Sequence, residues 1–134
     1  MKKDINQLIQ KKEYEKAEKL LKNLYDKNEI DYLQLHQLAF LNIIKSNNKE
    51  AINLLKKSIE KNPNYPNSYS DLGSLYLKEN QISEAKIYFL KSLDFNKNLF
   101  SSLNNLGLIY KNQKDYKSSI KYFLSSYNDD HNSF

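Results

Sequence analysis

The sequence contains no cysteine, tryptophan, arginine, valine or threonine, and it has only two glycines and two prolines. Without cysteine the chain can form no disulfide, perform no thiol chemistry and offer no thiolate to a structural zinc ion. Two glycines are too few for a glycine-rich phosphate-binding loop. The absence of valine and threonine, together with so few turn-forming residues, argues against a β fold. We therefore expect a helical chain.

All positive charge in the chain comes from lysine. The sequence has 21 lysines against 16 acidic residues, a net charge of +5, and the lysines alternate with glutamates, as in Glu15–Lys19 and Glu18–Lys22. Such i,i+4 pairs are typical of a solvated helix face. Arginine, the side chain best suited to recognise phosphate and guanine with two hydrogen bonds, is missing. We therefore expect no specific nucleic-acid partner, which leaves open a diffuse electrostatic attraction.

Long hydrophobic runs are also missing. None approaches the roughly 18 residues of a membrane span, and the opening Met1-Lys2-Lys3 is followed by polar residues and not by the apolar core of a signal peptide. With 40% apolar and 13% aromatic residues, the chain has too much apolar content for disorder. We expect a cytoplasmic protein that does not insert into membranes.

The two glycines, Gly73 and Gly107, lie 34 residues apart, and the sequence around them repeats at that period. Residues 71–76 (DLGSLY) align with residues 105–110 (NLGLIY). Further positions of the same register hold Ala85, Phe89 and Ser92, then Ser119, Phe123 and Ser126, and, one period earlier, Ala39, Ala51, Leu55, Ser58 and Pro63. The sequence therefore contains an internal repeat of 34 residues.

This spacing resembles the tetratricopeptide repeat over nearly the whole chain. The pattern is Leu-Gly-x-x-Tyr, then a small residue twelve positions after the glycine and an aromatic residue four positions later. The resemblance implies a single all-α domain, an α-solenoid of antiparallel helical hairpins, with a partial repeat at 1–31 and full repeats at 32–65, 66–99 and 100–133. The first full repeat departs from the pattern at Asn42, where the later repeats have Tyr76 and Tyr110.

The recurring glycine needs a structural reason, because glycine within a helix costs about 1 kcal/mol relative to alanine. We expect Gly73 and Gly107, with Ala39 at the same phase, to let the second helix of each hairpin approach the first closely. Periodicity and helix breakers predict helices over residues 4–10, 13–25, 31–45, 49–61, 67–79, 82–94, 100–112 and 115–127. Asn47 with Glu50 indicates a variant capping box, and Asp115 indicates an N-cap.

No arrangement of catalytic residues is apparent. The two histidines, His36 and His131, are far apart and share no metal-ligand spacing. The run Asp129-Asp130-His131 is better explained as a solvated tail than as a metal site. Ser74 follows Gly73 inside a helix and not on a strand-to-helix turn, so no nucleophile elbow is present. We expect no enzymatic activity, no cofactor and no bound metal.

The resemblance also indicates where a partner would bind. In tetratricopeptide repeats the first helix of each hairpin lines a concave groove for extended peptides, through repeat positions 2, 5, 6 and 9. In this sequence the corresponding residues are Leu33, His36, Gln37, Phe40, Asn67, Ser70, Asp71, Ser74, Ser101, Asn104, Asn105 and Leu108. None is a lysine, so the excess positive charge is expected elsewhere.

Within this groove, Gln37, Asp71 and Asn105 share one phase and could form a polar ladder that hydrogen-bonds a peptide backbone. The ladder is similar to the asparagine ladder of the repeats in O-linked N-acetylglucosamine transferases. The alternative is that these residues are solvated polar side chains on an exposed helix face. A carboxylate clamp, a second binding mode of such repeats, is disfavoured because Asp71 stands where a cation is required.

The C-terminal hairpin is expected to leave an apolar face partly uncovered. That face would carry some of Ile120, Tyr122, Phe123 and Tyr127, since no further capping helix follows. It suggests either self-association through this hairpin or a longer protein. Our leading hypothesis is a non-catalytic protein–protein interaction scaffold that binds an extended peptide. The alternative is the N-terminal recognition arm of a larger bacterial glycosyl-, sulfo- or methyltransferase.

Overall fold

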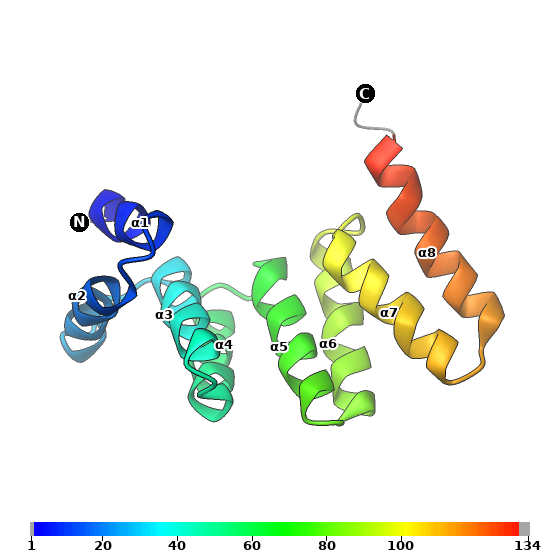
Figure 1. The fold of residues 1–134 in the computed structure, drawn as a ribbon, viewed down its shortest axis with the longest axis horizontal. Helices are drawn as coiled ribbons and strands as arrows, with labels where there is room; N and C mark the ends of the chain where they lie inside the picture. Colours follow the sequence, from blue (N-terminus) through cyan, green and yellow to red (C-terminus); the bar gives the residue numbers. More distant parts are fainter. Residues whose placement is uncertain (1, 132–134) are drawn as a thin grey trace. The chain divides into compact units, whose positions relative to one another are not determined.

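The computed structural model of the chain describes residues 2–131, and within this range all regular secondary structure is α-helical (Figure 1). Eight helices are described: α1 (Lys2–Gln10), α2 (Tyr14–Asp26), α3 (Tyr32–Ile44), α4 (Asn48–Lys61), α5 (Pro66–Lys78), α6 (Ile82–Phe95), α7 (Phe100–Asn112) and α8 (Tyr116–His131). The all-α class predicted from composition is confirmed. The predicted bounds agree within two residues, except that α8 continues four residues beyond its predicted end.

The helices form two compact units. The N-terminal unit, Met1–Pro63, contains α1–α4, and the C-terminal unit, Asn64–Phe134, contains α5–α8. Within the C-terminal unit the helices lie side by side in chain order, and α5 also contacts α7 (Figure 1). The first helices of the full hairpins are thus α3, α5 and α7. The single-domain organisation expected from the repeat stays a prediction.

Each hairpin turns through a residue in the left-handed region of backbone conformation. These residues recur every 34 positions, with φ between 60° and 63°: Lys12, Ser46, Asn80 and Lys114. After α5, the Asn80 amide donates to the Leu77 carbonyl and the Gln81 amide donates to the Tyr76 carbonyl, at 3.0 and 2.9 Å. This double closure satisfies carbonyls that the end of a helix leaves without partners. Neither glycine of the chain is used for it.

The helix starts differ in how they are capped. Asp31 and Gln34 form a capping box at α3, in which each side chain accepts a hydrogen bond from the other's backbone amide, at 2.8 and 3.0 Å. The capping box predicted at Asn47 is wrong. Asn47 does precede α4, but it makes no side-chain cap bond, because its ψ of 68° lies outside the extended conformation of a capping residue. Its backbone N–H, which Glu50 would need, donates to the Asn42 carbonyl at 2.8 Å. The predicted cap at Asp115 is confirmed by its bond from the Ser118 amide.

The glycine positions confirm the predicted close approach of paired helices. A Cβ atom added to Gly73 would lie 2.7 Å from Cε1 of Phe89, and one added to Gly107 would lie 2.6 Å from Cε1 of Phe123. Both distances are well inside van der Waals contact, so each ring occupies the volume that a side chain would need. Ser119, at the small-residue position of α8, donates its hydroxyl to the Gly107 carbonyl at 2.8 Å. Each of these two hairpins is therefore built on a glycine facing a phenylalanine ring.

Stacked tyrosines form a second contact inside the same two hairpins. The rings of Tyr76 and Tyr88 are 5.3 Å apart with an interplanar angle of 2°, and those of Tyr110 and Tyr122 are 5.5 Å apart at 1°. Offset stacking at such distances is a favoured arrangement of aromatic rings. The pairs join α5 to α6 and α7 to α8.

Candidate functional site

On α3, the predicted binding row keeps exposed apolar side chains and one amide that already has a partner. Leu33 and Phe40 are 43% and 40% exposed. The Gln37 amide donates to the Asn6 side chain on α1, and the Phe40 ring meets the Tyr14 ring edge-on, with centroids 6.3 Å apart. The row on α3 is therefore oriented by contacts from α1 and α2.

In the C-terminal unit, a serine pair joins the predicted rows of α5 and α7. Ser70 is only 3% exposed, and its hydroxyl lies 2.8 Å from that of Ser101. Asn105 donates to the Ser101 carbonyl at 2.8 Å, and Asn67 donates to the Tyr65 hydroxyl at 3.2 Å. Ser70 thus positions α5 against α7 and is itself shielded from solvent.

The remaining predicted residues of this unit form a mixed polar and apolar surface. Leu108 is 42% exposed, and Asp71, Ser74 and Asn104 are half-buried. A carboxylate, a hydroxyl and an amide together offer both acceptors and donors to a polypeptide backbone. We call the row on α5 and α7 formed by Asp71, Ser74, Ser101, Asn104, Asn105 and Leu108 the polar surface.

The polar ladder of Gln37, Asp71 and Asn105 is divided between the two units. Gln37 lies in the N-terminal unit, and Asp71 and Asn105 lie on the adjacent helices α5 and α7. Gln37 and Asn105 each use one amide N–H inside the molecule. A side-chain amide has two N–H donors and a carbonyl oxygen, so both retain hydrogen-bonding capacity for a ligand. Their contact with a peptide stays a prediction.

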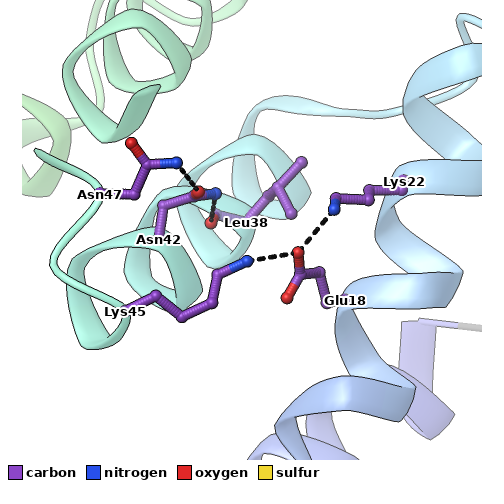
Figure 2. A network of polar contacts seen from close by, with 6 residues as sticks. All are labelled: Glu18, Lys22, Leu38, Asn42, Lys45 and Asn47. Atoms are coloured by element: carbon purple, nitrogen blue, oxygen red, sulfur yellow. Dashed lines mark hydrogen bonds and ion pairs between the residues drawn. The ribbon is translucent and has the colours of Figure 1, made fainter. Parts of the chain in front are cut away.

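Glu18 on α2 is the centre of an ion-pair network in the N-terminal unit (Figure 2). Its Oε1 atom lies 2.7 Å from Nζ of Lys22 on the same helix and 2.6 Å from Nζ of Lys45 after α3. The Glu18 side chain is only 14% exposed. Hydrogen bonds from Lys22, and next from Lys45, hold the pKa of Glu18 below its ordinary value. The network therefore fastens α2 to the end of α3.

Beside this network lies a pocket of about 760 Å³ that the sequence did not predict. It is lined by α2, by the second half of α3 and by the first half of α4. We call it the lysine-rimmed pocket, because Lys22, Lys45, Lys49 and Lys56 line it. The only signal for it in the sequence is Asn42, the departure from the tyrosine of the later repeats.

The apolar face predicted on α8 is exposed in part. Ile120, Leu124 and Tyr127 are 57%, 54% and 60% exposed. Tyr122 and Phe123 instead pack toward α7, as described above for their ring contacts. With Tyr116, which is 58% exposed, four large apolar side chains of α8 among those described remain at the surface of the C-terminal unit.

Among the side chains that the structure describes, no group of three or more histidine, cysteine, aspartate or glutamate residues could hold a metal ion. His36 is half-buried on α3, and the side chains of residues 129–131 lie outside the described ones. No described helix is both long enough and apolar enough to cross a bilayer.

Antiparallel helical hairpins on a 34-residue register define an α-solenoid built from repeats. Residues 54–87 and residues 100–127 each match a family model described as a tetratricopeptide repeat. Both segments therefore carry tetratricopeptide repeats. No curated protein sequence matches it.

Solved structures share this fold at low sequence identity. A structure titled as MamA is 18% identical, with a TM-score of 0.86 over 96% of this chain and 75% of that one. YrrB, titled as a TPR protein with an unusual peptide-binding site, is 15% identical, with a TM-score of 0.77 over 92% of this chain and 64% of that one. A tetratricopeptide repeat protein from Parabacteroides merdae is 18% identical, with a TM-score of 0.79 over 92% and 49% of the two chains.

Proposed function

We propose that the chain is a non-catalytic scaffold that binds an extended peptide on the exposed faces of its first helices. The polar surface on α5 and α7 is the binding face of the C-terminal unit. His36, Gln37 and Phe40 on α3 form the binding face of the N-terminal unit. The peptide backbone is hydrogen-bonded by the polar side chains, and its apolar side chains rest on Leu108 and Phe40.

The observation that carries the proposal is the hydroxyl pair of Ser70 and Ser101. This contact brings α5 against α7, so polar side chains from two helices share one surface. Because Leu108 is exposed beside them, the surface offers an apolar contact as well as hydrogen bonds. The shared fold with YrrB, which is described as having an unusual peptide-binding site, supports a peptide as the ligand class.

The test is a binding comparison on a partner recovered by pull-down from the source cells. Gln37, Asp71 and Asn105 are changed together to alanine, and we expect at least tenfold weaker binding with an unchanged helical circular dichroism spectrum. The matched control changes the exposed Gln81, Asp94 and Asn112 to alanine, which removes the same three side-chain types. Equal binding by the triple variant and its control would show that the partner does not use these faces.

Two further roles stay predictions. Self-association would use the exposed side chains of α8, and the role as recognition arm of a larger transferase is tested by the adjoining reading frame. Neither is needed for peptide binding by the polar surface.

A further inference from the structure

The lysine-rimmed pocket arises at one point of the repeat register. Asn42 occupies the phase of Tyr76 and Tyr110, and Leu54 occupies the phase of their stacking partners Tyr88 and Tyr122. Asn42 and Leu54 both line the pocket, and both are buried. The hairpin of α3 and α4 therefore lacks the two rings that fill this position in the later hairpins.

The floor of the pocket is fixed by hydrogen bonds. Asn42 Nδ2 donates to the Leu38 carbonyl at 2.9 Å, and Asn42 Oδ1 accepts from Asn47 Nδ2 at 3.2 Å (Figure 2). The amide is thus satisfied by the protein and is held in one orientation. Beside it, the buried Leu38 and Leu54 give the floor an apolar character.

The walls of the pocket are rich in positive charge. Lys22, Lys45, Lys49 and Lys56 line it, and its acidic side chains are Asp26 and Glu50. Glu18 already pairs with Lys22 and Lys45 on the side of α2 and α3, so their charge is shared with its carboxylate (Figure 2). The four lysines still outnumber the carboxylates of Asp26, Glu50 and Glu18, and this small positive excess beside an apolar floor favours a ligand with an apolar body and carboxylates beside it.

The size of the pocket suits a side chain with its neighbours. Its volume of about 760 Å³ lies within the range of about 300–1,000 Å³ that is usual for ligand pockets.

Lysine ammonium groups lie over tyrosine rings elsewhere in the chain. Nζ of Lys86 lies 4.5 Å from the ring centroid of Tyr110, and Nζ of Lys57 lies 4.8 Å from that of Tyr25, which itself lines the pocket. An aromatic ring in the pocket would find comparable cations.

We propose that the lysine-rimmed pocket binds an aromatic side chain, tyrosine or phenylalanine, of a partner polypeptide that carries aspartate or glutamate next to the ring. The ring takes the space left by the missing tyrosine pair and rests on Leu38 and Leu54. The adjacent carboxylates pair with the lysines of the rim. This site shares no residue with the predicted row on α3 or with the polar surface, and it does not depend on peptide binding there.

The first experiment fills the pocket with the pair of tyrosines that the later hairpins have at these positions. Asn42→Tyr combined with Leu54→Tyr rebuilds the ring pair of the later hairpins. The probe is the peptide acetyl-Asp-Glu-Tyr-Glu-Asp-amide, titrated into the full ¹⁵N-labelled chain, and binding is followed by amide chemical shifts. We expect the Asn42 and Asn47 side-chain signals of the unmodified chain to shift, and the filled variant to bind at least tenfold more weakly. Shifts confined to other residues, or equal binding by the filled variant, would overturn the proposal.

Two further binding comparisons test separately the tyrosine ring of the peptide and the lysine charge of the pocket. The matched peptide with alanine in place of tyrosine should bind at least tenfold more weakly. Equal binding would mean that the pocket recognises only charge and would overturn the aromatic part of the proposal.

The variant Lys49→Glu with Lys56→Glu leaves the pocket open and should also weaken binding of the tyrosine peptide at least tenfold. The control, Lys97→Glu with Lys111→Glu, makes the same charge change in the C-terminal unit and should not. These lysine variants keep the test decisive if the filled variant fails to fold, as judged by circular dichroism. The variant with Gln37, Asp71 and Asn105 changed to alanine should still bind the probe, which distinguishes the two sites.

Discussion

The hairpins of the two units solve one packing problem with different residues. In α5 and α6, Gly73 faces the ring of Phe89, whereas in α3 and α4 the same two phases hold Ala39 and Leu55, both fully buried. Ala39 is larger than Gly73, and Leu55 is smaller than Phe89. The summed side-chain volume of the two positions is therefore similar in both hairpins. Cores tolerate such volume-conserving exchanges best.

A second pair of positions differs without such compensation. The later hairpins hold two stacked tyrosines, and the hairpin of α3 and α4 holds Asn42 and Leu54, which are both smaller. Both residues are buried, and both line the lysine-rimmed pocket. The difference between the two units teaches that one contact of the repeat is kept in every full hairpin, while the other can be replaced by residues that line a pocket.

The largest expected effect comes from enlarging the glycine. Gly73→Leu would force a side chain into the ring of Phe89, which is fully buried, so we expect a loss of about 3 kcal/mol in the free energy of unfolding. Urea denaturation followed by circular dichroism measures it. The control Lys78→Leu places the same residue at an exposed position of α5 and should change stability by less than about 0.5 kcal/mol. Equal stability of the two variants would refute the helix-contact role of the glycine.

A smaller effect is expected when the glycine–phenylalanine pair of α5 and α6 is replaced by the alanine–leucine pair found in α3 and α4. The double variant Gly73→Ala with Phe89→Leu makes this replacement. We expect the double variant to be more stable than the sum of the single variants predicts, by about 1–2 kcal/mol, because the smaller residue makes room for the added methyl group. A double-mutant cycle in urea measures this coupling. Additivity within about 0.5 kcal/mol would mean that the two hairpins are not alternative packings of one contact.

The smallest effect concerns the ion pairs that Glu18 makes in the N-terminal unit. The pKa of Glu18 is lowered from 4.5 in the folded chain, so its contribution is present above the unfolded value and is lost as the pH falls through the folded value. Both lysines are about half or more exposed, so this contribution is below about 1 kcal/mol. Glu18→Gln should reduce stability at pH 7 and flatten its decline toward pH 3, as measured by urea denaturation. Glu84→Gln, at an exposed position of α6, is the control, and an identical pH profile for both variants would contradict the role of the network.

The helices and the glycine contact could be predicted from the sequence because both follow from a short-range register. Periodicity located each helix, and the recurrence of Gly73 and Gly107 indicated the close approach. Capping could not be predicted equally well, since the backbone conformation of Asn47 and the partner of its N–H depend on the turn between α3 and α4. The burial of Ser70 depends on Ser101 of another hairpin, and small residues at both positions were the available signal.

The candidate sites were predictable to different degrees. The exposure of Leu108 and Phe40 follows from their helical phase, because each lies away from the glycine or alanine that faces the partner helix. The lysine-rimmed pocket is lined by α2, α3 and α4, so the periodicity of a single helix does not predict it. Asn42 indicated a departure from the repeat, but the pocket also depends on Leu54, which is smaller than the tyrosine at the same position of the later repeats.

The left-handed turn residues set the increments by which this protein can evolve in length. Lys12, Ser46, Asn80 and Lys114 keep the same spacing as the repeat, and each fixes where one helix stops and the next begins. Insertion of a single residue within a hairpin would move its turn relative to Gly73 or its equivalents and rotate the packing face away from its partner. Duplication of a whole 34-residue segment would preserve both. Recombination can thus add or remove complete hairpins in such a gene, whereas small insertions are confined to the links between them.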